Sequence, residues 1–466
     1  MTVVRVAFVA ANREILPDAV IPFGLLNVMS AVPARHERWL VDVCFEEDPL
    51  RYVRSALGER PADLIAVGLR NIQNNDYDGI RDNLGWYEEL FTAIRETTDA
   101  PIVVGGGAFS VMPEGMMSRL RPDYGISGEG EQPLPLLLQA IEAGEGFDDV
   151  PNLYRWNGGE LVHHGHVQAF VDMNATPIVD RSVVKARYYE EHGIDSVQTK
   201  RGCNLRCSYC TYPVVEGRVS RRREPALVAD EFEAVQEQHP NVKHIFIVDS
   251  VFNLPPKHAK DVCRELIARD NKLPWTCYAN PLRFDDELAQ LMVAAGCAGV
   301  EVGTDSGCDE VLFRLKKGFD TNRVRQLRAS CERAGLPDCH NFILGTPGET
   351  LDDVKRTLDF IVDIDPFSAL LVCWVDDDEA LDPVLRVERQ RLREGVHEVM
   401  LEHKDLYPRW VMPALGVNFS TRLFRALRRN GLHGPLWQYA DNIPGGARKR
   451  KKMPPAPRML PMFEES

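Results

Sequence analysis

The sequence contains no uninterrupted apolar run of roughly 20 residues, the length that a membrane-spanning helix requires. Hydrophobic residues make up 44% and charged residues 27% of its 466 residues, as in soluble globular proteins. We therefore expect no transmembrane segment. The apolar N-terminus is interrupted by Arg5, and no small-residue cleavage site follows it, so we interpret it as a first strand and expect a cytoplasmic protein.

Basic charge is also in short supply. The chain has 69 acidic and 55 basic residues, which gives a net charge of −14. This balance argues against nucleic acid as the main partner, because nucleic-acid binding needs a basic surface. One basic run, Arg448–Lys452, lies in the Pro-rich tail of residues 446–466, and we expect this tail to be disordered.

A zinc motif is missing as well. A structural zinc site needs four nitrogen or sulfur ligands in two pairs, and no CxxC or HxxxH pair complements the one cysteine cluster of this chain. Eleven cysteines without an export signal point to a reducing compartment, where clustered thiols are metal ligands or catalysts more often than disulfides.

Residues 1–150 alternate between short β-rich runs and helical stretches, which predicts a doubly wound, Rossmann-like parallel sheet. The predicted strands are Val3–Ala10, Leu40–Phe45, Leu64–Leu69, Ile102–Val104 and Tyr124–Ile126. Ligands of such sheets bind outside the carboxyl ends of the strands. Two of the loops there are rich in glycine, which lets the backbone approach a bulky group or simply permits tight turns: Gly105, Gly106 and Gly107 in one loop and Gly128 and Gly130 in the next.

A hairpin and a polar stretch, residues 151–193, form the expected connection to a second α/β series. In residues 194–375 six strands are each separated by a helix-length segment, which predicts a partial (β/α)6 barrel. Residues 376–445 are expected to be helical, with an amphipathic helix at Thr421–Arg429 closed by Gly431. The aromatic segment from Trp410 to Tyr439 either closes the lower opening of the barrel, contacts the substrate or packs as an ordinary amphipathic helix.

Three cysteines, Cys203, Cys207 and Cys210, follow the first predicted barrel strand and so lie on a loop at the functional rim. Three thiolates at this spacing bind three corners of an iron–sulfur cubane and leave one iron open for another ligand. We therefore predict a [4Fe–4S] cluster, and we interpret the other cysteines as small core or surface residues.

The segment from Lys200 to Cys210 resembles the CxxxCx(aromatic)C hallmark of radical S-adenosylmethionine enzymes. The resemblance implies that the open iron binds the methionine part of S-adenosylmethionine. It further implies contacts to this cofactor from Tyr209 at the adenine, from Asp249 and Ser250 at the methionine amino group, from the Glu301–Ser306 segment with Glu301 and Asp305 at the ribose and carboxylate, and from Gly345 and Glu349 beside the adenine.

Nearly the whole chain resembles the subfamily in which a cobalamin-binding domain precedes the barrel. The resemblance is carried by the segments Ile21–Leu26, Gly68–Ile72, Val104–Ser110, Gly128–Glu131 and Gln198–Cys203. It implies a cobalamin site formed by Arg70, Asn71, Gly105, Gly106, Gly107, Gly128 and Glu129.

The first loop of the N-terminal region lacks the DxHxxG histidine that many cobalamin proteins offer to cobalt. Arg70 is then our candidate for the residue that faces the metal, although a guanidinium has no lone pair with which to ligate it. The alternative for Arg70 is an ion pair with Asp76 or Asp78.

The resemblance implies a C-methyltransferase of secondary metabolism, in which a 5′-deoxyadenosyl radical activates a small-molecule substrate and methylcobalamin provides the methyl group. It also implies an external electron donor of the flavodoxin or ferredoxin type. A radical enzyme that uses cobalamin without methylating, in cyclisation or ring contraction, is the alternative. Relatives carry a GxRIYPGTxL segment after the sixth strand, whereas here Leu370–Val375 runs directly into Asp376–Leu381.

Overall fold

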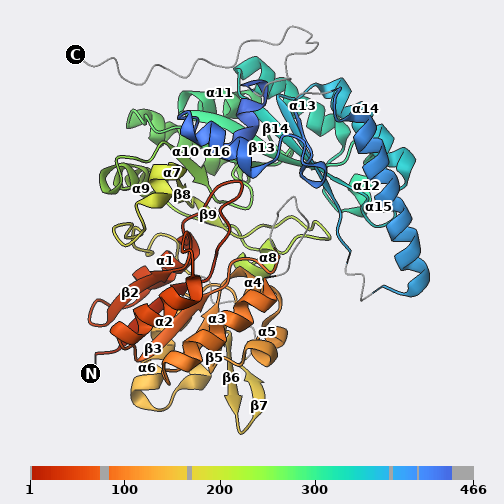
Figure 1. The fold of residues 1–466 in the computed structure, drawn as a ribbon. Helices are drawn as coiled ribbons and strands as arrows, with labels where there is room; N and C mark the ends of the chain where they lie inside the picture. The colour runs from red at the N-terminus through yellow and green to blue at the C-terminus, as the bar shows by residue number, and fades with distance from the viewer. Residues whose placement is uncertain (1–2, 74–82, 165–170, 377–380, 407–408, 443–466) are drawn as a thin grey trace.

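The structure is a computed structural model, and it describes residues 3–73, 83–164, 171–376, 381–406 and 409–442. The chain forms two lobes, each built on a seven-stranded sheet, as Figure 1 shows. The expected tail of residues 446–466 lies outside the described residues.

The first lobe is the predicted parallel sheet. Its strand order is β2-β1-β3-β4-β5-β6-β7, and β1 to β5 are parallel. The strands are β1 (Arg5–Ala10), β2 (Glu37–Asp42), β3 (Leu64–Gly68), β4 (Ile102–Gly105) and β5 (Tyr124–Ile126). The helices are α1 (Phe23–Ala31), α2 (Pro49–Glu59), α3 (Leu84–Thr97), α4 (Gly107–Val111), α5 (Pro113–Leu120) and α6 (Pro133–Ala143). Hydrophobic side chains on both faces of this sheet are buried, as its position between helices requires.

The hairpin that we expected in the connection belongs to the first sheet. Its strands β6 (Leu153–Asn157) and β7 (Glu160–His163) are antiparallel, and β6 pairs with β5. The turn residues Gly158 and Gly159 both have positive φ, which a two-residue hairpin turn requires. The sequence pattern identified the hairpin, but strand partners depend on contacts between distant segments.

The second lobe has the strand order β16-β15-β14-β13-β12-β11-β8, and all of these pairs are parallel. Six strands correspond to the predicted ones: β8 (Ile194–Val197), β11 (His244–Ile247), β12 (Trp275–Ala279), β13 (Cys297–Asp305), β14 (Asp338–Leu344) and β15 (Ser368–Cys373). The end strands β8 and β16 (Trp410–Val411) are not neighbours, so the barrel is partial. We missed β16 because two residues carry no periodicity.

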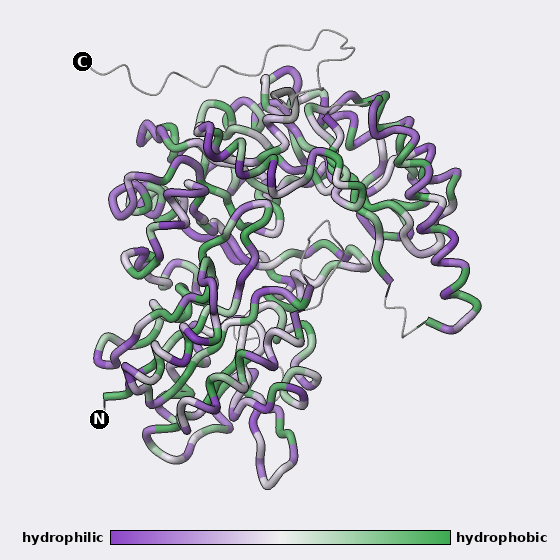
Figure 2. The backbone as a smooth tube through the Cα atoms, viewed as in Figure 1, coloured by the Kyte–Doolittle hydropathy of each residue, from purple (hydrophilic) through white to green (hydrophobic). Residues whose placement is uncertain are grey.

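Helices cover the outer face of the second sheet. They are α9 (Pro225–Gln238), α10 (Pro256–Ala268), α11 (Asp286–Ala294), α12 (Asp309–Arg314), α13 (Thr321–Ala334) and α14 (Leu351–Ile364). The helix α14 begins with a capping box, in which the side chains of Thr350 and Asp353 each accept a hydrogen bond from the other's backbone N–H. Hydrophilic and hydrophobic residues alternate along these outer helices in Figure 2, as expected for helices with one buried side.

The C-terminal region is mostly helical, as predicted, with α15 (Pro383–His403) and α16 (Thr421–Arg429). Its last described segment closes the base of the barrel. A Cβ atom on Gly299 in β13 would lie 2.6 Å from the Trp437 ring, so only glycine lets the indole pack there. The Gln438 amide donates a hydrogen bond of 2.5 Å to the Ala298 carbonyl.

The two lobes share one hydrophobic core. Ile21, Phe23 and Leu26, at the start of α1, pack with residues of β8, β11 and α9. Ion pairs add to this joint, because Asp18 lies 2.5 Å from the guanidinium of Arg428 in α16 and 2.9 Å from the ring of His192. The loop before α1 therefore reaches from the first lobe to the second, and Figure 1 shows this loop between them.

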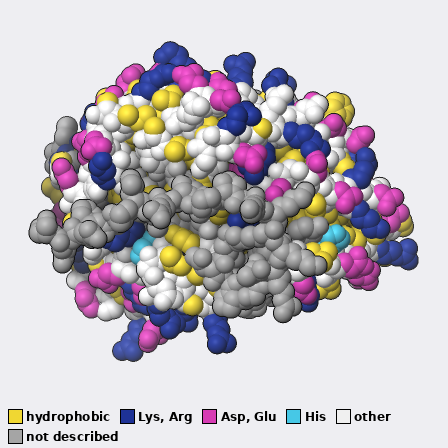
Figure 3. Space-filling view, turned by 90° about the horizontal axis from the view of Figure 1, so that it is seen from above, with side chains coloured by type: hydrophobic (Ala, Val, Ile, Leu, Met, Phe, Trp, Pro, Cys, Tyr) yellow, Lys and Arg dark blue, Asp and Glu magenta, His cyan; other side chains and the backbone are white. Residues whose placement is uncertain are grey.

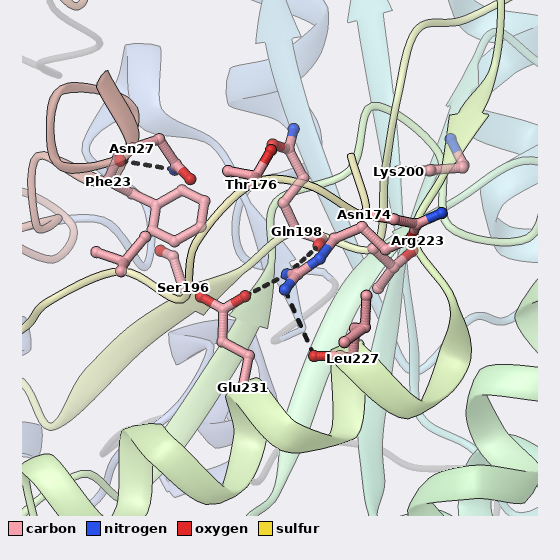
Figure 4. A network of polar contacts seen from close by, with 12 residues as sticks. Phe23, Asn27, Asn174, Thr176, Ser196, Gln198, Lys200, Arg223, Leu227 and Glu231 are labelled. Carbon is pink, nitrogen blue, oxygen red and sulfur yellow. Dashed lines mark hydrogen bonds and ion pairs between the residues drawn. The ribbon is translucent and has the colours of Figure 1, made fainter. Parts of the chain in front are cut away.

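A buried network anchors the strand that leads to the cysteines. Arg223 donates to the Gln198 carbonyl at 3.1 Å, to the Leu227 carbonyl at 3.4 Å and to the carboxylate of Glu231 in α9, as Figure 4 shows. Glu231 also pairs with Arg181 of the connection. The network fixes the carboxyl end of β8 against α9.

The face of the molecule in Figure 3 carries acidic and basic side chains interspersed with one another. None of the helices that the structure describes is long and apolar enough to cross a membrane.

Candidate functional site

The cysteine loop follows β8 and lies between two short antiparallel strands, β9 (Lys200–Arg201) before it and β10 (Arg221–Arg222) after it. Gly202 has a φ of +85°, and a Cβ atom there would lie 2.1 Å from the Val219 carbonyl oxygen, so no other residue fits. Backbone hydrogen bonds fix the loop: Cys203 N–H donates to Gly217 at 3.2 Å, and Ser208 N–H donates to Leu315 at 3.0 Å.

The three thiols are free and partly exposed. Burial raises the pKa of Cys207 and of Cys210, while the charge of Lys317 lowers both. Each of these two thiols also feels the charge of Cys203. No group of three His, Cys, Asp or Glu side chains within the described ranges is placed to hold a single metal ion. In a cubane each of three cysteine thiolates binds a separate iron.

Tyr209 and Asp305 lie together beside the cysteines. The Tyr209 hydroxyl donates a short hydrogen bond to Asp305, and burial raises the pKa of this hydroxyl. Lys317 lies 2.7 Å from the Asp305 carboxylate and 3.1 Å from the Tyr209 oxygen, and the Lys317 and Asp305 side chains are buried. Sequence reasoning missed Lys317. One of two consecutive lysines after α12 gives no local sign that it turns inward.

Asp249 and Ser250 follow β11, and their side chains differ in hydrogen bonding. Asp249 is fully buried, and its Oδ1 accepts the backbone N–H of Thr199 at 2.8 Å and of Lys200 at 3.2 Å. Its carboxylate thus holds the end of β8, and the expected contact to the amino group of the cofactor stays a prediction. The buried Ser250 hydroxyl has no hydrogen-bond partner within the described part of the chain.

Gly345 and Glu349 lie on the loop between β14 and α14. Glu349 Oε2 accepts the Thr346 N–H at 2.7 Å, while its buried Oε1 has no partner among the described residues. Burial raises the pKa of Glu349. Arg389 of α15 holds this loop by donating to the carbonyls of Gly345 and Thr346. Ser250 Oγ and Glu349 Oε1 therefore retain the hydrogen-bonding capacity that a polar cofactor such as S-adenosylmethionine would use.

One cavity of about 1330 Å³ joins the two lobes. From the first lobe it is lined by Arg70, Asn71, Gly105, Gly106, Gly107, Gly128 and Glu129. From the second it is lined by inward-facing residues of the barrel strands, including Gln198, Phe246, Tyr278, Glu301 and Leu370. The carboxyl edge of the first sheet therefore faces the inside of the second, as the ligand-site rule for parallel sheets anticipates.

The glycines of the first lobe are required by the fold. Gly106 has φ +97° and ψ 179°, a conformation essentially restricted to glycine, and a Cβ atom there would lie 2.4 Å from the Leu69 oxygen. Gly128 has a φ of +76°. The tight-turn interpretation thus accounts for these two residues, and it leaves the glycine-lined part of the cavity wall without side chains. Such a wall fits a broad, flat ring like that of cobalamin.

Arg70, directly after β3, is exposed and lines the cavity. Burial raises the pKa of Tyr212 to about 12 and that of Tyr278 well above its usual value, and the positive charge of Arg70 opposes both shifts. Arg70 therefore faces the barrel across the cavity. The alternative partners, Asp76 and Asp78, lie outside the described residues.

The Glu129 carboxylate forms ion pairs within the protein, and its expected role in cofactor binding stays a prediction. It pairs with Arg201 at 3.0 Å and with Arg221 at 2.7 Å, and Arg201 also pairs with Glu131 at 2.6 Å. All four side chains are at most 13% exposed. This network connects a loop of the first lobe to the residue two before Cys203, and sequence reasoning missed it because the partners lie far apart in the chain.

Glu301 lies inside the barrel. It is in the middle of β13, four residues before Asp305, and it lines the cavity there. The Trp437 indole N–H donates to Glu301 Oε1 at 3.1 Å. The expected contact of Glu301 and Asp305 with the ribose and carboxylate of the cofactor stays a prediction.

Comparison with known proteins gives a consistent result. Residues 197–361 match the Radical SAM superfamily. The chain is 30% identical over 433 residues to tryptophan 2-C-methyltransferase of Streptomyces laurentii, covering 77% of this chain and 70% of that protein.

Solved structures agree with this match. The radical S-adenosylmethionine methyltransferase TsrM from Kitasatospora setae, solved with cobalamin and a [4Fe-4S] cluster bound, superposes with a TM-score of 0.71 at 28% identity, over 80% of this chain and 72% of that one. TsrM has also been solved with tryptophan substrate and a SAM analogue bound. The cobalamin-dependent S-adenosylmethionine radical enzyme OxsB shares the fold, with a TM-score of 0.68 at 18% identity, over 85% of this chain and 56% of that one.

Proposed function

The chain belongs to the cobalamin-dependent radical S-adenosylmethionine methyltransferases, and we propose that it methylates a carbon atom of an aromatic small metabolite of the tryptophan type. One observation carries the proposal. A single cavity extends from the glycine-lined edge of the first sheet to the inner face of the second, and Arg201, Tyr212 and Glu216, which flank the cysteines in the chain, line it. Cobalamin and a substrate must meet in this reaction, and one continuous cavity provides a place for both.

We assign the cluster to Cys203, Cys207 and Cys210. The nearby cation Lys317 favours the thiolate forms that bind iron. We assign S-adenosylmethionine to the space bounded by Ser250 and Glu349, whose buried oxygens have hydrogen-bonding capacity to spare. When bound, the cluster supplies the electron for cleavage of S-adenosylmethionine, and cobalamin supplies the carrier for the methyl group.

We assign cobalamin to the glycine-lined wall, with Arg70 facing the cobalt. A guanidinium cannot ligate a metal, so Arg70 would exclude water from that face without replacing it as a ligand. The Arg70→His substitution offers a ligand in the same place and should change the visible spectrum of bound cobalamin. A spectrum equal to that of the wild type would remove Arg70 from this role.

Tryptophan is the first substrate to test, because it is the substrate named for the relatives. The barrel interior has the aromatic and apolar character that an indole requires, with Phe246 and Tyr278 in edge-to-face contact at 5.1 Å. We propose a small electron carrier of the flavodoxin or ferredoxin type as the source of electrons.

The test uses the full chain, reconstituted under anaerobic conditions with iron, sulfide and cobalamin. Incubation with methyl-labelled S-adenosylmethionine, a reductant and tryptophan should transfer the label to a carbon of tryptophan. Label on a different aromatic metabolite would correct the substrate. Formation of 5′-deoxyadenosine with no labelled product from a panel of such metabolites would instead support the non-methylating alternative.

A further inference from the structure

Glu301 is the one acidic side chain that the described part of the second sheet points into the barrel cavity from the middle of a strand. It lies level with Tyr278 on one neighbouring strand and with Cys339 on the other. Residues of β11 and β15, such as Phe246 and Leu370, make the adjoining wall apolar. A carboxylate in such surroundings needs an explanation, because its desolvation is costly.

The hydrogen bond with Trp437 does not explain why residue 301 is an acid. The indole N–H donates to Glu301 at 3.1 Å, and a hydrogen bond with Asn341 helps to lower the Glu301 pKa, which burial raises. The uncharged oxygen of a glutamine would accept the indole N–H equally well. No lysine or arginine forms an ion pair with Glu301 within the described residues. A buried carboxyl group without a cation either keeps its proton or needs a ligand that supplies the cation.

We propose that Glu301 is a specificity-determining residue that binds the protonated amine of an aromatic substrate. The amine would replace the missing cation, and the aromatic body would lie against the wall that contains Phe246 and Tyr278. This inference rests on the proposed function for the place of the substrate, and it adds the charge that the substrate must carry.

Glu301, which would bind the substrate amine, lies apart from the residues at the rim of the barrel. Glu301 is four residues below Asp305 on β13, and Asp305 is already engaged by Lys317 and Tyr209. A substrate amine at Glu301 would therefore be bound on the barrel floor side, next to Trp437, with the rest of the molecule directed toward the rim and the glycine-lined wall.

The experiment measures binding of three matched probes by calorimetry: tryptamine, which is cationic; indole-3-ethanol, which is neutral; and indole-3-propionate, which is anionic. The protein is the full chain loaded with cluster and cobalamin, without reductant or S-adenosylmethionine. We expect tryptamine to bind at least tenfold more tightly than the alcohol, and the propionate to bind most weakly.

In Glu301→Gln, which keeps the size of the side chain and the acceptor for Trp437, tryptamine and the alcohol should bind alike. Glu332→Gln, an exposed residue of α13, is the control for the change in net charge and should keep the preference.

Three results would overturn the inference: no preference for the amine in the wild type, an unchanged preference in Glu301→Gln, or no binding of any of the three probes. Because the assay needs no turnover, it is independent of methyl transfer. A chain that shows the amine preference and yet methylates no amine would leave the role of Glu301 intact and contradict the proposed function.

Discussion

The two sheets of this protein present different chemistry to the same cavity. The first sheet offers backbone at Gly105 to Gly107 and at Gly128, together with polar side chains such as Arg70 and Asn71. The second sheet offers a row of inward-facing side chains, such as Phe246, Tyr278 and Glu301. The difference indicates that the first lobe binds a large preformed ring by shape, whereas the second positions reacting atoms with individual side chains.

The strongest test of this difference is Cys207→Ala. Removing one of the three thiols should prevent stable assembly of the cluster and abolish all turnover, because the cluster is assigned only three protein ligands. Iron content and the paramagnetic resonance signal measure the loss.

Cobalamin binding should survive in this variant, since the glycine-lined wall is unchanged. Cys373→Ala, at another free cysteine that lines the cavity, is the control and should retain four irons. Full turnover in Cys207→Ala would contradict the assignment of the cluster.

The next largest effect is expected at the joint between the two sheets. Glu131→Gln removes one partner of the buried Arg201 and should destabilise the folded protein by about 3 kcal/mol, as breaking a buried pair typically does. Urea unfolding measures the change. Glu37→Gln, in an exposed pair with Arg60 on the first lobe, should cost less than about 1 kcal/mol. Equal effects at both sites would show that the joint contributes no more than a surface pair.

A change in the backbone of the first lobe should reduce the stability of the folded protein somewhat less. Gly106→Ala forces an L-residue into a conformation essentially restricted to glycine and should cost about 1–3 kcal/mol from strain, with weaker cobalamin binding. Thermal unfolding and cobalamin titration test both effects. Gly58→Ala, in α2 with no atom nearer than 3.9 Å to the added Cβ, should be neutral or stabilising. Unchanged cobalamin affinity in Gly106→Ala would argue that this wall does not contact the ring.

An effect that appears only in acid concerns the second sheet. Burial lowers the pKa of His244, at the start of β11, to about 3. An unfolded histidine has a pKa of about 6.5, so acid protonates the unfolded chain first. The folded protein is therefore favoured above the unfolded pKa of about 6.5, where the histidine is neutral in both states. This stability is lost as pH falls from about 6.5 toward 3, by about 1.4 kcal/mol per pH unit.

His244→Gln should therefore show a shallower loss of stability than the wild type between pH 6.5 and pH 5 in urea unfolding. The Thr276 hydroxyl, which lies 2.8 Å from the His244 ring, would retain a hydrogen-bonding partner in glutamine. An identical pH dependence in the two proteins would exclude His244 as a cause of the loss of stability in acid.

The sequence by itself determined the two α/β series, the hairpin, the helix Thr421–Arg429 and the position of the cysteine loop after β8. These features depend on local patterns: periodicity, glycine turns and the spacing of cysteines within one short segment. The family could be inferred from the same short motifs, because the residues that carry them are neighbours in the chain.

Only the tertiary structure decided which side chains meet. It assigned Glu129 to Arg201 and Arg221, Asp249 to the end of β8, and Glu301 to the inside of the barrel. It also brought Lys317 to Asp305, and it added the hairpin to the first sheet and β16 to the second. Each of these outcomes depends on contacts between segments far apart in the chain, and a single sequence contains no local signal for such contacts.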